Sequence, residues 1–185
     1  MHLDTITKLL NIPNYRAVEV TGREYEGMFG IILERVKDTP PVCSGCGRIH
    51  GMSVHSEGTI TVEDLMISGK RVFLLVPKRK VPCLEDGRIR VEELQWLNGR
   101  FTARFAEQVY RLTSITTNQE AGWFLRLDDE TVYRIDKRKL EELALEKLDP
   151  VPAPKHMSVD EVAWQKWHKY VTNVIDIDQR KVIWN

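Results

Sequence analysis

The sequence lacks an excess of either charge, because its 27 lysine and arginine residues are matched by 27 aspartate and glutamate residues. A nucleic-acid surface would therefore have to come from local clusters of basic residues. The sequence also lacks any apolar run near the roughly 20 residues that span a bilayer, and residues 1–10 lack the pattern of a cleaved signal peptide. The lack of a long apolar run and of a signal-peptide pattern predicts a cytoplasmic protein with no membrane partner.

Cysteine is scarce as well, with three residues in a chain of 185. Their number is odd, and Cys43 and Cys46 form a Cys-x-x-Cys pair, so reduced thiols or a metal site are favoured over a disulfide framework. The length and the 42% hydrophobic content suit one ordinary domain or two to three small ones.

Residues 43–47 have the composition of a zinc knuckle, in which two thiolates grip one metal ion and glycines let the backbone fold around the sulfurs. One knuckle supplies half of a tetrahedral site, and the second half is expected at residues 83–87. A degenerate ribbon without metal is the alternative. The predicted ligands of a structural zinc ion are Cys43, Cys46, Cys83 and Asp86, with His50 or His55 as substitutes for Asp86.

From Met1 to Pro82 the pattern is mainly that of β strands, after a short amphipathic helix that carries Ile6, Leu9 and Leu10 and stops before Pro13. Alternating or short apolar runs rich in branched and aromatic residues mark the strands. The expected strands lie at residues 16–20, 28–33, 59–62 and 71–76, with a turn at 64–70 between the last two.

Between residues 93 and 148 the apolar positions recur at helical spacing. A first helix is expected at 102–114, with Phe101, Phe105, Val109, Leu112 and Ile115 on one face. A Thr-x-x-Glu capping box at 117–120 starts a second helix that ends near residue 126 and buries Ala121, Phe124 and Leu125. Asp128 caps a third, from 129 to about 148.

Three helices with short connections predict a helix-turn-helix, whose third helix lies along base edges in a major groove. The acidic stretch 128–130 would repel phosphate unless it caps the helix or contacts cytosine amino groups. A helical bundle, with basic runs that only protect strand edges, is the alternative. The predicted DNA contacts are Lys78, Arg79, Lys80, Thr131, Tyr133, Arg134, Lys137 and Arg138, and Arg88, Arg90, Arg100 and Arg104 extend the basic strip.

Residues 149–154 alternate proline with other residues and predict an extended linker, after which strands are expected at 157–164, 170–177 and 181–184. Asp160 stands inside the first of these strands. A strand carboxylate suits a two-metal phosphoryl-transfer site, although such a residue more often pairs with a lysine or arginine.

Taken in order, these residues resemble the amino-terminal part of a bacterial insertion-sequence transposase of the ISL-three family. The similarity extends over nearly the whole chain. It is carried by residues 10–16, 41–47 and 64–70, the basic run before Cys83, residues 134–138 and 159–163, and residues 168–170 and 176–178.

The resemblance implies an α+β protein of several modules: a β-rich zinc-ribbon-like part at 1–92, a helix-turn-helix at 93–148, a linker at 149–156, and the first antiparallel strands of a ribonuclease H-like domain at 157–185. It implies binding of double-stranded DNA at terminal inverted repeats, in the nucleoid of a bacterial cell. Asp160 corresponds to the first residue of an Asp-Asp-Glu triad, and Asp86 stands where the family usually has a fourth cysteine.

The second Asp and the Glu of that triad have no counterpart in this sequence, so we expect it to be catalytically incomplete as given, with magnesium bound only in a complete catalytic domain. A DNA-binding regulator or a protein-interaction module derived from a transposase is the alternative function. Self-association is expected too, because the last three strands would leave apolar faces uncovered.

Overall fold

The computed structural model describes all residues except 1, 24–26, 37–38, 147–152, 166–168 and 185. The chain forms two units, Met1–Lys139 and Leu140–Asn185, which are described separately. No helix in the described part of the chain is long and apolar enough to cross a membrane.

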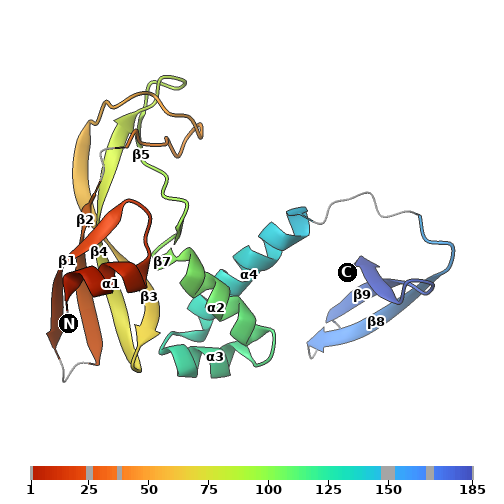
Figure 1. Ribbon diagram of the computed structural model, residues 1–185. Helices are drawn as coiled ribbons and strands as arrows, with labels where there is room; N and C mark the ends of the chain where they lie inside the picture. The colour runs from red at the N-terminus through yellow and green to blue at the C-terminus, as the bar shows by residue number, and fades with distance from the viewer. Residues whose placement is uncertain (1, 24–26, 37–38, 147–152, 166–168, 185) are drawn as a thin grey trace. The chain divides into compact units, whose positions relative to one another are not determined.

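The first unit contains a mixed sheet of seven strands (Figure 1). Its strands follow one another in the order β1-β2-β4-β3-β7-β6, and β5 pairs with β4 beyond the main path. The neighbours β2 and β4 are parallel, whereas β1–β2 and β3–β4 are antiparallel. The strands are β1 (Tyr15–Arg23), β2 (Met28–Arg35), β3 (Ser56–Ile67), β4 (Lys70–Pro82), β5 (Ile89–Val91), β6 (Leu97–Asn98) and β7 (Phe101–Thr102).

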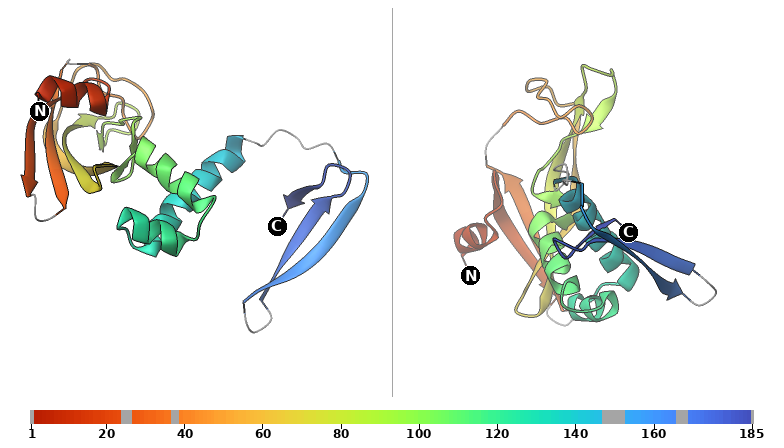
Figure 2. Two further views of the ribbon diagram at one scale, coloured as in Figure 1. Left: turned by 60° about the horizontal axis from the view of Figure 1, so that its bottom comes forward. Right: turned by 90° about the vertical axis from the view of Figure 1, so that its right-hand side faces the viewer.

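The helix expected at the start of the chain is confirmed as α1 (Leu3–Leu10), which lies beside β1 (Figure 2). Ile6 and Leu10 are one turn apart and enter the core of the sheet, where they join the branched side chains of β2, β3 and β4. Leu9 is exposed, although the sequence placed it with the other two.

The β3–β4 hairpin is longer than the sequence predicted, and its turn is shorter. Only Ser68 and Gly69 form the turn, both at positive φ, as two-residue hairpin turns require. The expected turn residue Asp64 is instead a buried strand residue. Its carboxylate accepts hydrogen bonds from Thr102 and Arg104, and these tertiary partners are what make an aspartate acceptable inside a strand.

Three helices complete the first unit, and the last of them extends past its final residue, Lys139. They are α2 (Ala103–Thr113), α3 (Asn118–Leu125) and α4 (Asp129–Glu146). Their predicted starts are confirmed. Thr102 caps α2, Thr117 and Glu120 form a full capping box on α3, and the Asp128 carboxylate accepts from the Thr131 amide in the first turn of α4.

The helices share a second apolar core, which is separate from that of the sheet. Phe101 and Phe105 stack within it, with ring centroids 5.2 Å apart, and Leu125 and Val132 join them from α3 and α4. Two residues expected on the buried faces, Ile115 and Phe124, are exposed instead. The pairing of β7 with β3 connects this core to the sheet. The domain boundaries predicted from the sequence stay predictions.

The second unit contains a small antiparallel sheet of three strands in the order β10-β9-β8. Its strands confirm the predicted pattern: β8 (Met157–Gln165), β9 (Lys169–Asp176) and β10 (Lys181–Trp184). Of the predicted linker, residues 149–152 lie outside the described residues, and 153–156 have no regular structure. The coarse α+β class is thus confirmed, and a ribonuclease H-like identity for the last sheet stays a prediction.

Candidate metal centre and nucleic-acid interface

Two loops with the same backbone geometry face each other beyond the ends of β4 and β5. In the first loop the Cys43 amide donates to the Arg48 carbonyl over 2.9 Å, and the Gly47 amide donates to the Cys43 carbonyl over 2.8 Å. Gly47 has a φ of 70°, a left-handed conformation that glycine adopts without steric cost. The loop therefore has the compact turn that the Cys-x-x-Cys-Gly sequence predicts.

The second loop repeats this pattern. The Cys83 amide donates to the Arg88 carbonyl over 2.8 Å, the Gly87 amide donates to the Cys83 carbonyl over 3.0 Å, and Gly87 has a φ of 67°. Asp86 stands where the first loop has Cys46. The backbone of the second knuckle is thus intact although its second cysteine is absent.

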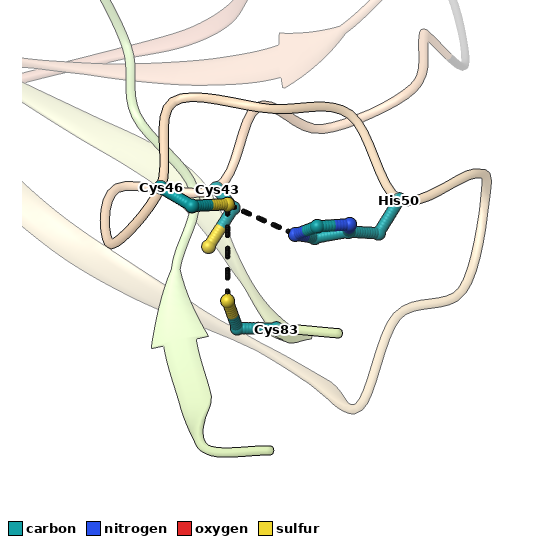
Figure 3. Close-up of side chains that lie close together, drawn as sticks. All are labelled: Cys43, Cys46, His50 and Cys83. Atoms are coloured by element: carbon teal, nitrogen blue, oxygen red, sulfur yellow. Dashed lines mark hydrogen bonds between the residues drawn. The ribbon is translucent and has the colours of Figure 1, made fainter. Parts of the chain in front are cut away.

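Four donor atoms meet between the loops (Figure 3): the sulfurs of Cys43, Cys46 and Cys83 and a ring nitrogen of His50, all within 4.8 Å of one another. The sulfurs of Cys46 and Cys83 are 3.8 Å apart. Two sulfurs that each bind one zinc ion at about 2.3 Å in a tetrahedron are separated by roughly this distance. The donor set and its spacing therefore fit a closed structural zinc site of the Cys3His type.

The fourth donor is His50, one of the two substitutes that the sequence offered for Asp86. Its Nε2 lies 3.0 Å from Cys46 Sγ. The carboxylate of Asp86 accepts hydrogen bonds from the Arg88 amide and the Arg90 guanidinium, both at 3.0 Å, and lies outside the four-donor set. The guanidinium of Arg90 is the main cause that lowers the pKa of Asp86 to about 2.

His55, the other substitute, is exposed, and its Nδ1 lies 3.3 Å from the hydroxyl of Ser56. It is likewise outside the four-donor set. The structure thus gathers Cys46, His50 and Cys83 around the sulfur of Cys43. It leaves the other two predicted candidates, Asp86 and His55, outside the site.

The surroundings of the sulfurs affect their ionisation. Burial opposes ionisation of Cys43, but the amides of Gly45 and Cys46 donate to its sulfur and lower its pKa. At Cys83 the Asp86 amide also favours the thiolate, but burial and the side chains of Asp86 and Cys43 raise the pKa to about 11. Because zinc binds thiolates, its binding must release protons, and zinc affinity must fall as the pH falls.

The candidate nucleic-acid contacts on α4 divide into two sets. Tyr133, Arg134, Lys137 and Arg138 recur at helical spacing and are exposed, whereas Thr131 is buried. The Thr131 hydroxyl donates to Asp128 over 2.7 Å and accepts from Arg100 over 3.4 Å, so it serves the helix start and the neighbouring hairpin.

The three basic residues of β4 also differ in burial, because successive strand residues point to opposite faces. Lys80 is exposed and Lys78 is half-buried. Arg79 is buried and pairs with Glu92, at 2.9 Å between Nη2 and Oε2. Its guanidinium is therefore part of the protein interior, while the two lysines lie on the outer side.

Asp160 lies on β8, opposite Asn173 of β9, and is exposed. The zinc donors are the one group of three or more histidine, cysteine and acidic side chains that meets closely enough for a metal ion among the described residues. Asp160 alone therefore does not form a two-metal site.

Sequence reasoning missed a cavity between the β6–β7 turn and α4, which brings Asn98 and Arg100 beside Arg138. The sequence marked Arg100 only as part of a basic strip. The cavity depends on the packing of residues about 40 positions apart, and no local pattern reveals such a contact.

Comparison with known proteins agrees with this geometry. Residues 39–86 match the family profile described as the zinc-finger of transposase IS204/IS1001/IS1096/IS1165, and this range contains all four donors. The chain is similar to the transposase for insertion sequence element IS1001 of Bordetella parapertussis, with 33% identity over 145 residues. No solved structure matches the chain at a significant level.

The aligned region covers 77% of this chain and 35% of that relative, so the chain spans about a third of the relative's length. The matched range begins just before the first knuckle and ends at Asp86 in the second, and the structure brings the two knuckles together. Residues 39–86 therefore match the zinc ribbon of ISL3-type transposases, and the chain is similar to an insertion-sequence transposase that has this ribbon.

Proposed function

We propose that the first unit binds double-stranded DNA at the terminal inverted repeats of an insertion element, with α4 as the helix that enters the major groove. The observation that carries this proposal is the division of α4 into two faces. Val132 and Ile135 pack in the helical core, while Tyr133, Arg134 and Lys137 are exposed. A helix held by its own core and presenting aromatic and basic side chains suits groove binding.

The connection between α3 and α4 supports this assignment. It consists of three residues, of which Arg126 has the left-handed conformation that ends α3 and Asp128 caps α4. Short connections of this kind are typical of helix-turn-helix units. The acidic start of α4 is explained by capping, since the Asp128 carboxylate bonds the amide and the hydroxyl of Thr131.

The zinc-ribbon part has a structural role in this proposal. A metal ion held by two loops would fix the end of the β4–β5 ribbon, from which the exposed Lys80 and the half-buried Lys78 extend the basic surface. For Asp160 we propose the role that the family implies, as one carboxylate of a site for metal-dependent phosphoryl transfer on DNA. Such a site needs several converging carboxylates and its own magnesium ions.

A salt titration of DNA binding tests the proposal. Fluorescence anisotropy is measured with a labelled duplex that carries the terminal inverted repeat of the parent element, and with a shuffled duplex. We expect tighter binding to the repeat, and affinity that falls steeply with salt as counterions are released. Replacing Lys137 with glutamine should reduce the slope of log K against log salt by about 1.

The matched control is Lys8→Gln, because Lys8 is an exposed lysine on α1. This variant should keep the slope of the unaltered protein. Binding that is indifferent to both sequence and salt would contradict the proposal.

A further inference from the structure

A cavity of about 300 Å³ lies between the β6–β7 turn and α4, within the first unit. It has no acidic residue in its lining. The turn supplies one wall, and α4 supplies the other. The lining residues are Asn98, Gly99, Arg100, Phe101, Thr131, Arg134, Ile135 and Arg138.

Two of the three arginines at this cavity are held by neutral partners. Arg138 donates from Nη1 to the Asn98 side-chain oxygen over 2.8 Å. Arg100 donates to the Thr131 hydroxyl over 3.4 Å, and its guanidinium carbon lies 5.2 Å from the centre of the Phe101 ring. These contacts orient both guanidinium groups without neutralising them, and each retains several N–H donors.

Most other arginines of the first unit differ in this respect, because a carboxylate compensates their charge. The arginines with such a partner are Arg16, Arg35, Arg48, Arg71, Arg79, Arg90, Arg104, Arg111 and Arg134. Among the described residues, Arg100 and Arg138 have no carboxylate partner. Their two charges therefore lie at one cavity without a neighbouring carboxylate, so an anion bound there would be attracted by both.

Arg134 stands at the rim of the cavity, largely exposed, with Nε 3.4 Å from Glu130 Oε1. This ion pair is long and solvent-exposed, so it is weak, and Arg134 can turn to a stronger anionic partner at little cost. The cavity thus offers two oriented guanidinium groups and a third at its edge.

We propose that this cavity binds one backbone phosphate of double-stranded DNA, with Arg100 and Arg138 as the donors. Guanidinium groups match phosphate oxygens in charge and geometry. The inference rests on the proposed function, since Arg134 and Arg138 also belong to the exposed face of α4. The β6–β7 turn would then act as a clamp that fixes the register of α4 on the duplex, because phosphate contacts position a protein without reading sequence.

The test uses fluorescence anisotropy on the full chain with a labelled duplex of about 30 base pairs, roughly three helical turns. The variants are Arg100→Gln, Arg138→Gln and the double variant. Each should weaken binding to the repeat and to the shuffled duplex alike, and should reduce the salt slope by about 1. The double variant should show the same reduction, because both arginines share one phosphate.

Arg16→Gln is the matched control, because it removes the same charge from β1, where Arg16 pairs with Glu34 at 2.7 Å in an exposed position. Its salt slope should equal that of the unaltered protein. The side chains of Arg16 and Arg138 are both at the surface, and equal thermal midpoints for all variants show that folding is preserved.

The outcomes separate the two proposals. If the unaltered protein binds no duplex, the proposed function fails. If it binds with a steep salt slope that Arg100→Gln and Arg138→Gln leave unchanged, the cavity proposal fails and the proposed function stands. A slope reduced by about 2 in the double variant would indicate two separate phosphates and would overturn the shared site. Saturable binding of inorganic phosphate without any effect of the variants on DNA would also overturn it, in favour of a free-anion site.

Discussion

Replacing Cys83 with serine is expected to lower the zinc content of the protein from about one equivalent to less than about a tenth after purification without chelator. Cys83 is buried, and its sulfur lies 3.8 Å from that of Cys46 across the two knuckles. Its loss would remove the only donor contributed by the second loop to the four-atom set. Because structural zinc contributes about 10–16 kcal/mol in small zinc-binding peptides, the ribbon end should lose its fixed structure.

Two further variants identify the fourth ligand, and both are measured by inductively coupled plasma analysis. His50→Ala should lose zinc readily to a chelator, because the imidazole nitrogen is part of the donor set. Asp86→Asn should keep about one equivalent, because that carboxylate is held by Arg88 and Arg90. The reverse result, with zinc lost in Asp86→Asn and kept in His50→Ala, would make Asp86 the ligand. Unaltered protein without zinc would overturn the metal centre itself.

The pH dependence of zinc binding follows from the same groups. Zinc requires thiolates, and the thiol of Cys83 has its pKa raised to about 11 before any cation is present. Binding must therefore displace protons, so zinc should be released as the pH is lowered. Release is expected to be progressive on acidification, and Asp86→Asn should move it to lower pH, because the Asp86 side chain helps to raise the pKa of Cys83.

Replacing Glu92 with alanine is expected to destabilise the first unit by about 3–5 kcal/mol, the cost of leaving a buried charge without its partner. The Glu92 side chain is buried and pairs with Arg35 at 2.6 Å and Arg79 at 2.9 Å. It also accepts from the Arg79 amide over 2.8 Å. Removing the carboxylate would leave the enclosed Arg79 guanidinium without its counter-charge.

Thermal unfolding followed by near-ultraviolet circular dichroism measures this effect. At about 2–4 °C per kcal/mol for a chain of this size, the midpoint should fall by roughly 6–20 °C. The control is Glu34→Ala, which removes an exposed ion pair with Arg16 and should cost less than about 1 kcal/mol. Equal midpoints for the two variants would show that the Glu92 network does not hold the sheet together.

Local chemistry made much of this fold predictable. Thr117 with Glu120 and the lone Asp128 mark helix starts through hydrogen bonds that span only three residues, so a pattern in the sequence captures them. The strands β8, β9 and β10 were equally visible in the sequence, because apolar and branched residues recur there.

The features that the sequence did not reveal depend on distant partners. Asp64 reads as a turn residue until Thr102 and Arg104 supply its hydrogen bonds. Arg79 reads as a surface charge until Glu92 meets it inside the protein. His50 was one of several candidate ligands, and the donor set that includes it is completed only by Cys83 from the second knuckle. Such contacts follow from tertiary packing, which overrides local pattern.

The proposed DNA-binding surface consists of α4 and the β6–β7 turn. The most direct measurement is a nuclear magnetic resonance titration of ¹⁵N-labelled protein with the terminal-repeat duplex, which reports each backbone amide separately. We predict the largest shift changes at Gly99, Arg100 and residues 131–138. Changes confined to α1 and β1, or to the strands of the second unit, would contradict the claim.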